Sequence, residues 1–140
     1  LVFTTEEAWA SRHGTEMGAG GYASVHLRTL PETPAGWRDD ALAETWEKLR
    51  AIRRVATGAL EIERREKRIG ASLEAALTVH LADEAMAEAV QGRDLAEFFI
   101  TSDVTVQNDA GPQSAFRLPE IPGIAVTPHV SDHEKCQRCW

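Results

Sequence analysis

Apolar side chains recur at spacings of three and four through the middle of the chain, which is the spacing of one helix face. They are Leu42, Trp46, Leu49, Ile52, Ala56 and Leu60. Asp39 or Asp40 is suited to cap the start, and Gly70 follows a basic last turn. The pattern predicts one helix over residues 39–68, about 45 Å long. Gly58 lies in its middle and predicts either a bend or close packing there.

Shorter segments precede this helix. Hydroxyl and then acidic side chains at residues 4–7 predict a helix start, and Gly14 predicts its end. Residues 14–21 contain four glycines but lack the Gly-Lys-Ser/Thr signature of a phosphate loop, which favours a connector. Residues 24–27 have the composition of a short extended piece. Pro31 and Pro34 indicate a stiff, non-helical linker.

Beyond Gly70 the pattern changes to short alternating runs. Residues 77–81 alternate like a strand, with His80 expected on its outward side, and residues 82–90 and 94–97 favour short helical pieces. A β-rich run at 98–101 is continued by 104–106 after an interruption at 102–103. A turn at 108–112 precedes two short strands at 115–118 and 124–126. The expected fold class is α+β: a helical segment with one long helix, followed by a small mixed α/β module.

Charge is unevenly distributed along the chain, whose formal net charge is −7. Between Lys48 and Arg68 lie eight basic residues and only three acidic ones, a local excess of five positive charges. Such a stripe on an acidic body is a footprint for phosphate contact, and its C-terminal end holds Arg64, Arg65, Lys67 and Arg68. The alternative is a solvated helix face with internal ion pairs, for which Glu44–Lys48, Glu61–Arg65 and Glu63–Lys67 have the favourable spacing.

Other function classes find little support. The sequence contains no run of about 18 apolar residues, the length needed to span a membrane, and no secretory signal is visible. A cytoplasmic protein is therefore expected. Hydrophobic residues make up 43% and charged residues 26%, as in a globular protein. No nucleophile–base pair, carboxylate pair or nucleotide fingerprint stands out, so no catalytic site is expected in this chain.

The two cysteines, Cys136 and Cys139, form a Cys-x-x-Cys pair close to the last residue. Two cysteines exclude a disulfide scaffold, and a redox site is disfavoured because no helix follows the pair. In a structural zinc site the pair would supply two of four ligands. His129 and His133 are alternative local ligands, but only two residues separate His133 from Cys136, which makes a strain-free tetrahedron doubtful. A metal-free tail remains open.

Several segments, in their order along the chain, resemble bacterial isoleucyl-tRNA synthetases. They are VFTTEEAW at 2–9, SVHL at 24–27 leading to LPE at 30–32, KRIGASLEAA at 67–76, FFITS at 98–102 and KCQRCW at 135–140. Each match is short. Because the segments follow the family's order over the whole chain, the resemblance as a whole is specific.

The resemblance implies a role that composition does not reveal. Enzymes of this family attach isoleucine to tRNA with ATP and Mg²⁺ and edit mischarged valine, in domains N-terminal to the similar region. The segment is therefore expected to bind the anticodon arm of the isoleucine tRNA as a monomer. Arg138 and Trp140 correspond to the residues that read the anticodon, and Cys136 and Cys139 to the first half of a zinc site. The second cysteine pair of the family lies beyond Trp140, so only a half-site, a truncated zinc-knuckle tail, is expected here.

The resemblance also divides the chain. Residues 1–36 correspond to the end of the anticodon-binding helical bundle and a connector, 37–72 to the long basic helix, 73–127 to a junction module and 128–140 to the start of the zinc finger. Two alternatives remain. One is a stand-alone helical interaction module that associates through Leu42, Trp46 and Leu49. The other is the equivalent region of a valyl- or leucyl-tRNA synthetase, against which the CQRCW tail argues.

Overall fold

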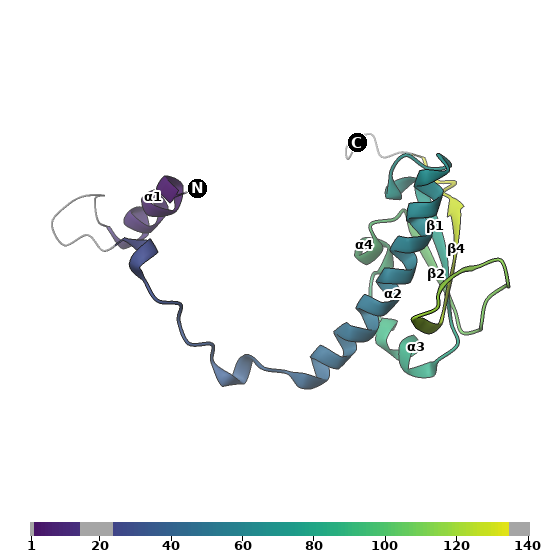
Figure 1. The fold of residues 1–140 in the computed structure, drawn as a ribbon, viewed down its shortest axis with the longest axis horizontal. Helices are drawn as coiled ribbons and strands as arrows, with labels where there is room; N and C mark the ends of the chain where they lie inside the picture. Colours follow the sequence, from purple (N-terminus) through teal and green to yellow (C-terminus); the bar gives the residue numbers. More distant parts are fainter. Residues whose placement is uncertain (1, 15–23, 135–140) are drawn as a thin grey trace. The chain divides into compact units, whose positions relative to one another are not determined.

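The computed structural model describes residues 2–14 and 24–134 of the chain. These residues form two compact units, divided between Arg38 and Asp39 (Figure 1). The first unit is small and helical. The second unit contains the long helix and a four-stranded sheet. Each unit has its own internal contacts.

The first unit is built on helix α1 (Val2–His13), which ends at Gly14 in the left-handed conformation, as the sequence predicts. The expected extended piece at 24–27 is wrong, because Val25–Leu27 forms a 3₁₀ turn, η1. The hydroxyl of Ser24 accepts a hydrogen bond from the His26 backbone N–H at 3.1 Å and so caps this turn. A second 3₁₀ turn, η2 (Ala35–Trp37), follows the non-helical linker.

The second unit begins with helix α2 (Asp40–Arg65), which confirms the long helix. Asp39 is its cap, since its side chain accepts a hydrogen bond from Leu42 N–H at 2.9 Å. The predicted stop at Gly70 is wrong. Lys67 adopts the left-handed conformation with φ 59°, and Arg68 N–H bonds to Glu63 C=O at 2.9 Å, so the helix ends at Arg65.

Four strands follow in the spatial order β2-β1-β4-β3. They are β1 (Ala75–Leu81), β2 (Asp103–Gln107), β3 (Phe116–Leu118) and β4 (Ile121–Val130). β1 pairs in parallel with β2 and antiparallel with β4, which forms a hairpin with β3. The 3₁₀ turn η3 (Ser72–Glu74) leads into β1, and helices α3 (Glu84–Val90) and α4 (Leu95–Phe99) connect β1 to β2. The mixed sheet beside a long helix confirms the α+β class.

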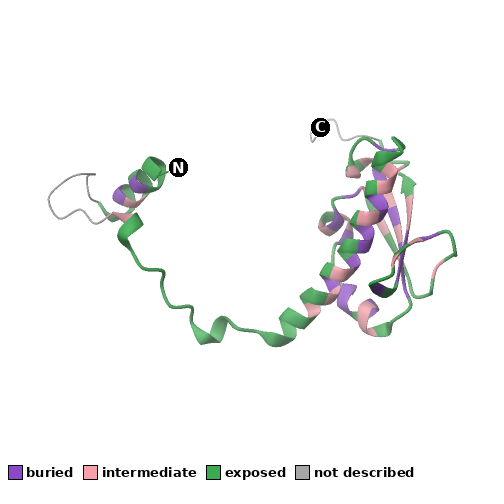
Figure 2. Ribbon diagram, viewed as in Figure 1, coloured by how far each residue is buried: buried purple, intermediate pink, exposed green. Residues whose placement is uncertain are grey.

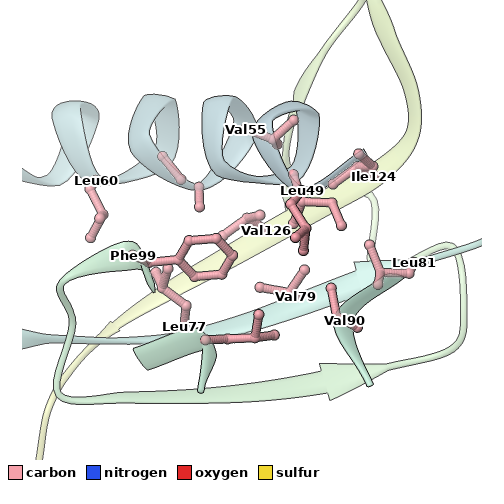
Figure 3. Close-up of a cluster of buried hydrophobic side chains, with 14 of the residues drawn as sticks. Leu49, Val55, Leu60, Leu77, Val79, Leu81, Val90, Phe99, Ile124 and Val126 are labelled. Atoms are coloured by element: carbon pink, nitrogen blue, oxygen red, sulfur yellow. The ribbon is translucent and has the colours of Figure 1, made fainter. Parts of the chain in front are cut away.

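The core lies between α2 and one face of the sheet (Figures 2 and 3). Alternate side chains of β1 and β4 point into it, because successive strand residues face opposite sides. Helix α2 contributes residues at helical spacing. The largest fully buried side chains of this core are Leu49, Ile52, Val55, Leu77, Val79, Leu81, Ile124 and Val126. The long helix therefore belongs to the hydrophobic core of the α/β module itself.

Gly58 lies where α2 crosses the β3–β4 hairpin. A Cβ atom at this position would lie 2.7 Å from Cε1 of Phe116, well inside van der Waals contact. The helix runs through this residue without a break. Of the two sequence interpretations, close packing is therefore confirmed: the glycine leaves space for the Phe116 ring.

The β-rich run at 98–101 does not form a strand, so that prediction is wrong. Phe98 and Phe99 end helix α4, which Asp94 caps by accepting a hydrogen bond from Glu97 N–H at 3.0 Å. Burial of Phe99 in the core, where it is 5% exposed, outweighs the β propensity of its sequence neighbours. Ile100 ends the helix with φ 60°, and β2 starts only at Asp103.

His80 is buried, at 5% exposure, although the sequence predicts an outward position on β1. It does lie on the face of the sheet away from α2, but the segment after β2 covers it. Nδ1 of His80 lies 2.6 Å from Oδ1 of Asp109, and since a carboxylate only accepts, Nδ1 donates. Arg117 holds the covering segment by donating to the backbone C=O of Ala110 and Pro112 at 2.7 and 2.9 Å.

This pair predicts an acid-sensitive contact. The hydrogen bond from His80, and then that from Gly111 N–H, lower the pKa of the Asp109 carboxyl. A lowered folded pKa adds stability that is complete above the unfolded value, about 3.9, and is lost as the pH falls through the folded pKa. Asp109→Asn is therefore expected to flatten the fall in the free energy of unfolding below about pH 4, measured by urea denaturation at each pH.

His80→Phe provides the matched test, because it keeps a ring and removes the donor. It is expected to remove most of the same acid dependence. If His80→Phe keeps the wild-type slope while Asp109→Asn loses it, the pairing with His80 is not the cause.

Candidate nucleic-acid interface

The four cations singled out at the end of the basic stripe lie together at the C-terminal end of α2. Arg64 and Arg65 occupy its last turn, and Lys67 and Arg68 the turn that follows, and all four are exposed. The left-handed Lys67 reverses the chain direction here, so the charges gather over a short stretch. Cations at this position also interact favourably with the negative end of the helix dipole.

Two of the four cations are already paired with acids of the same segment. Nη1 of Arg64 lies 2.6 Å from Oε2 of Glu61. Arg68 contacts both oxygens of Glu63, at 2.5 and 2.6 Å, and also bonds to Glu66. The hydrogen bond from Arg68 lowers the pKa of Glu63, and the hydrogen bond to Glu63 raises the pKa of Arg68. Arg64 and Arg68 thus follow the simpler interpretation of a helix face with internal ion pairs.

Arg65 and Lys67 make no ion pair or side-chain hydrogen bond within the described part of the chain. The predicted pairs Glu61–Arg65 and Glu63–Lys67 are replaced by Glu61–Arg64 and Glu63–Arg68. The helix ends before Lys67, so the i,i+4 geometry that would pair it with Glu63 is not formed. Of the four cations of the basic turn, this exchange of partners leaves Arg65 and Lys67 available for an anion.

The basic turn and the start of the C-terminal tail lie at the same end of the unit. Glu74 links Gly70, two residues after the basic turn, to the tail: its side chain accepts from Gly70 N–H at 2.8 Å, and its backbone C=O accepts from Ser131 N–H at 2.8 Å. The last strand, β4, reaches this end through the pairing of Val130 with Ala75. Residues more than sixty positions apart in sequence are therefore brought together where the tail begins.

The remaining candidates, Arg138, Trp140, Cys136 and Cys139, lie outside the described residues. Within residues 2–14 and 24–134, no group of three or more His, Cys, Asp or Glu side chains is arranged to hold a metal. His129, the alternative ligand, has its Nε2 2.9 Å from the hydroxyl of Thr78 on the neighbouring strand. The backbone N–H of His133 bonds to the Ser131 hydroxyl at 3.2 Å.

Sequence reasoning missed a second feature of the unit, a hollow between α2 and the segment that includes α4. Trp46 and Arg53 line it from α2, and Arg93 and Phe98 from the other side. The sequence signal was available, since Trp46 and Arg53 are seven residues apart and share a helix face. Their contact with Phe98, and the position of Arg93 on the opposite wall, depend on how the two segments pack.

Comparison with known proteins gives no matching family model. The isoleucine–tRNA ligase of Agrobacterium fabrum is 51% identical over 140 residues, all of this chain. That of Brucella abortus is 49% identical over the same 140 residues, and that of Caulobacter vibrioides 46% identical over 138. The chain belongs to the isoleucine–tRNA ligase family. The match confirms the resemblance noted in the sequence, and the chain spans about 14% of the length of its Agrobacterium and Brucella relatives.

The Agrobacterium and Brucella ligases match all 140 residues of this chain, at 51% and 49% identity. Both units therefore have counterparts within one matching segment of these relatives. The described helices include none that combines the length and apolar character needed to cross a membrane. Within the described residues, the candidate interface elements are the basic turn, the start of the tail beside it, and the hollow on α2.

Proposed function

We propose that this chain is a tRNA-binding segment of an isoleucine–tRNA ligase and contacts the anticodon arm. The observation that carries the proposal is that Glu74 bonds both to Gly70, two residues after the basic turn of residues 64–68, and to Ser131 at the start of the tail. The tail continues toward Arg138 and Trp140, whose side chains are suited to hydrogen bonding and stacking on unpaired bases. We propose that Arg138 and Trp140 contact the same tRNA as the basic turn.

The four cations have different parts in this proposal. Arg65 and Lys67 bind backbone phosphates, because no described carboxylate competes for them. Arg64 and Arg68 hold the turn in place through Glu61, Glu63 and Glu66. For the tail we propose zinc, with Cys136 and Cys139 as two thiolate ligands and two further ligands from elsewhere.

For the whole enzyme, the proposed reaction is the ATP- and Mg²⁺-dependent attachment of isoleucine to its tRNA in the cytoplasm, by a monomer. Its catalytic and editing sites are proposed to lie outside this segment. The role of the segment is then to orient the tRNA, which fits its charge pattern and its relatives.

The rival interpretation is a module that associates with a partner through Leu42, Trp46 and Leu49. One of these three side chains is not available for such a contact. Leu49 is only 2% exposed and packs in the unit's own core. A dimer contact through all three side chains would require the core to open. We therefore do not propose it.

The test neutralises the two available cations and measures binding of the isoleucine tRNA over a range of salt. The double variant Arg65→Gln/Lys67→Gln is expected to weaken binding on the order of tenfold at low salt. The slope of log K against log salt is expected to fall by roughly 0.7–0.9 for each phosphate that the variant no longer binds.

The matched control is Lys48→Gln/Arg50→Gln, which removes the same charge from the N-terminal half of the stripe on α2. It is expected to leave the salt slope unchanged. An equal loss of affinity in both double variants would indicate diffuse attraction, and no loss in the first would remove the basic turn from the interface.

A further inference from the structure

The hollow on α2 has the size and the wall chemistry of a ligand site. Its volume is about 640 Å³, within the range of sites for small molecules and cofactors. Its walls come from the N-terminal half of α2 and from the segment of Gly92 to Ile100. It lies apart from the basic turn at the other end of the helix, so it is a separate feature of the unit.

Two aromatic side chains form the apolar wall. Trp46 and Phe98 meet edge to face, with ring centroids 5.8 Å apart and an interplanar angle of 60°. Trp46 remains 36% exposed, so part of its indole is open to solvent beside the hollow. An edge-to-face pair leaves ring surface free for a third planar group, such as a nucleobase.

Two arginines line the hollow, and a hydrogen bond from Nε holds each side chain in place. Nε of Arg53 donates to Phe98 C=O at 3.2 Å, and its guanidinium lies 5.6 Å from the Phe98 ring centroid. Nε of Arg93 donates to Ala89 C=O at 2.9 Å. Neither guanidinium forms an ion pair with a carboxylate among the described residues. Both therefore keep terminal N–H donors for an anion, at low entropic cost.

The hollow also contains acceptors. Glu97 lines it as an exposed carboxylate, and Asp94 lines it while capping α4. An apolar peptide segment seated here would bury Arg53, Arg93 and Glu97 without partners, which is costly. A nucleotide instead offers a phosphate to the arginines, a planar base to the aromatics and base N–H groups to a carboxylate.

Helix α4 ends at the rim of the hollow. Ile100 lines the hollow in the left-handed conformation with φ 60°. Ile100 N–H bonds to Glu97 C=O at 3.2 Å and Thr101 N–H to Ala96 C=O at 2.9 Å, so this conformation closes the helix.

From these contacts we propose that the hollow binds one unpaired nucleotide of an RNA strand. The base packs against Trp46 and Phe98, and Arg53 and Arg93 bind its phosphate. The inference rests on the proposed tRNA binding for its RNA source, and it adds a second contact on the same unit. The basic turn would bind the phosphates of one part of the RNA strand, and the hollow would bind a single base in another part of the same strand.

The experiment uses the whole 140-residue chain, labelled with ¹⁵N, and follows the indole N–H signals of its tryptophans. GMP is the first probe and the isoleucine tRNA the second. With GMP, the Trp46 indole signal of the wild type is expected to shift saturably, and the backbone amide signals of Glu97 and Phe98, which line the hollow, report GMP binding in every variant. Trp46→Leu is expected to weaken GMP binding by about 5- to 150-fold, the range for loss of one stacked base. Arg53→Gln/Arg93→Gln is expected to weaken it by about tenfold or more, because charge-assisted hydrogen bonds to the phosphate are lost.

The matched controls are Trp37→Leu, a tryptophan exposed in the first unit, and Lys48→Gln/Arg50→Gln. Both are expected to bind GMP within about twofold of wild type, because none of these residues lines the hollow. Backbone amide spectra check that each variant is folded. Equal GMP binding by wild type and Trp46→Leu, or equal loss in Trp37→Leu, overturns the proposal.

The two proposals fail separately. If Trp46→Leu leaves GMP and tRNA binding intact while Arg65→Gln/Lys67→Gln weakens tRNA binding, the hollow is wrong and the basic turn stands. If GMP shifts Trp46 but the basic-turn variant binds tRNA normally, the hollow stands alone. If the hollow receives an apolar segment of the ligase instead, GMP leaves the Trp46 signal unchanged, which also overturns the nucleotide site.

Discussion

Gly111→Ala is expected to lower the free energy of unfolding of the second unit by about 2–4 kcal/mol. Gly111 has φ +68°, which a residue with a Cβ atom adopts only at a cost. The added Cβ would also lie 2.7 Å from Cγ and 2.9 Å from Cδ2 of His80. The imidazole is buried and held by Asp109, so it has little room to move. Urea denaturation followed by circular dichroism measures the effect.

Gly92→Ala is the control that separates the two causes. Gly92 has φ +68° as well, but nothing lies within 4 Å of an added Cβ. Its expected cost is about 1 kcal/mol, from backbone strain alone. If the two variants are equally destabilised, the closeness of Gly111 to the His80 ring has no energetic effect and the packing of this segment is less tight than described.

Ile52→Ala is expected to lower the free energy of unfolding by about 2–5 kcal/mol. Ile52 is 0% exposed in the middle of α2, where the helix packs on the sheet. Truncation removes buried apolar surface and leaves a cavity that the surrounding side chains fill only partly. Because helix and sheet share one core, α2 and β1 should unfold in a single transition in both wild type and variant.

Arg50→Ala, two residues before Ile52 on the same helix, is the control. Arg50 is exposed, and its replacement is expected to change the stability by no more than about 0.5 kcal/mol. A decrease in stability below about 1 kcal/mol in Ile52→Ala would mean that α2 is not a wall of this core. Separate transitions for helix and sheet signals would lead to the same conclusion.

Local sequence patterns predicted most elements of the second unit. The three-and-four spacing of apolar residues specified α2, and Asp39 marked its start, because capping depends on residues within one turn. Alternation predicted β1, and β-branched residues at 104–106 predicted β2. The order of short motifs along the chain identified the ligase family before any coordinates, and the relatives confirm it.

Two of the wrong predictions share one physical cause, a contact between segments distant in sequence. Phe99 joined α4 because its ring enters the core, and His80 became buried because the 108–115 segment folds over it. Neither the burial of Phe99 nor that of His80 can be predicted from the residues next to it in the sequence. The helix end moved to Arg65 because the Arg68 backbone and guanidinium bond to Glu63, which left Gly70 without a role in the stop.

The sequence by itself determined the α+β class, the long basic helix and the family, since these depend on spacing, charge and motif order. Only the tertiary structure decided which cations stay available, because Glu61 and Glu63 pair with Arg64 and Arg68 and leave Arg65 and Lys67. It also brought Trp46 and Arg53 to Phe98 and Arg93, more than thirty residues away. Contacts between distant segments depend on how their buried faces pack together. A local sequence pattern shows which face is buried but not which segment packs against it.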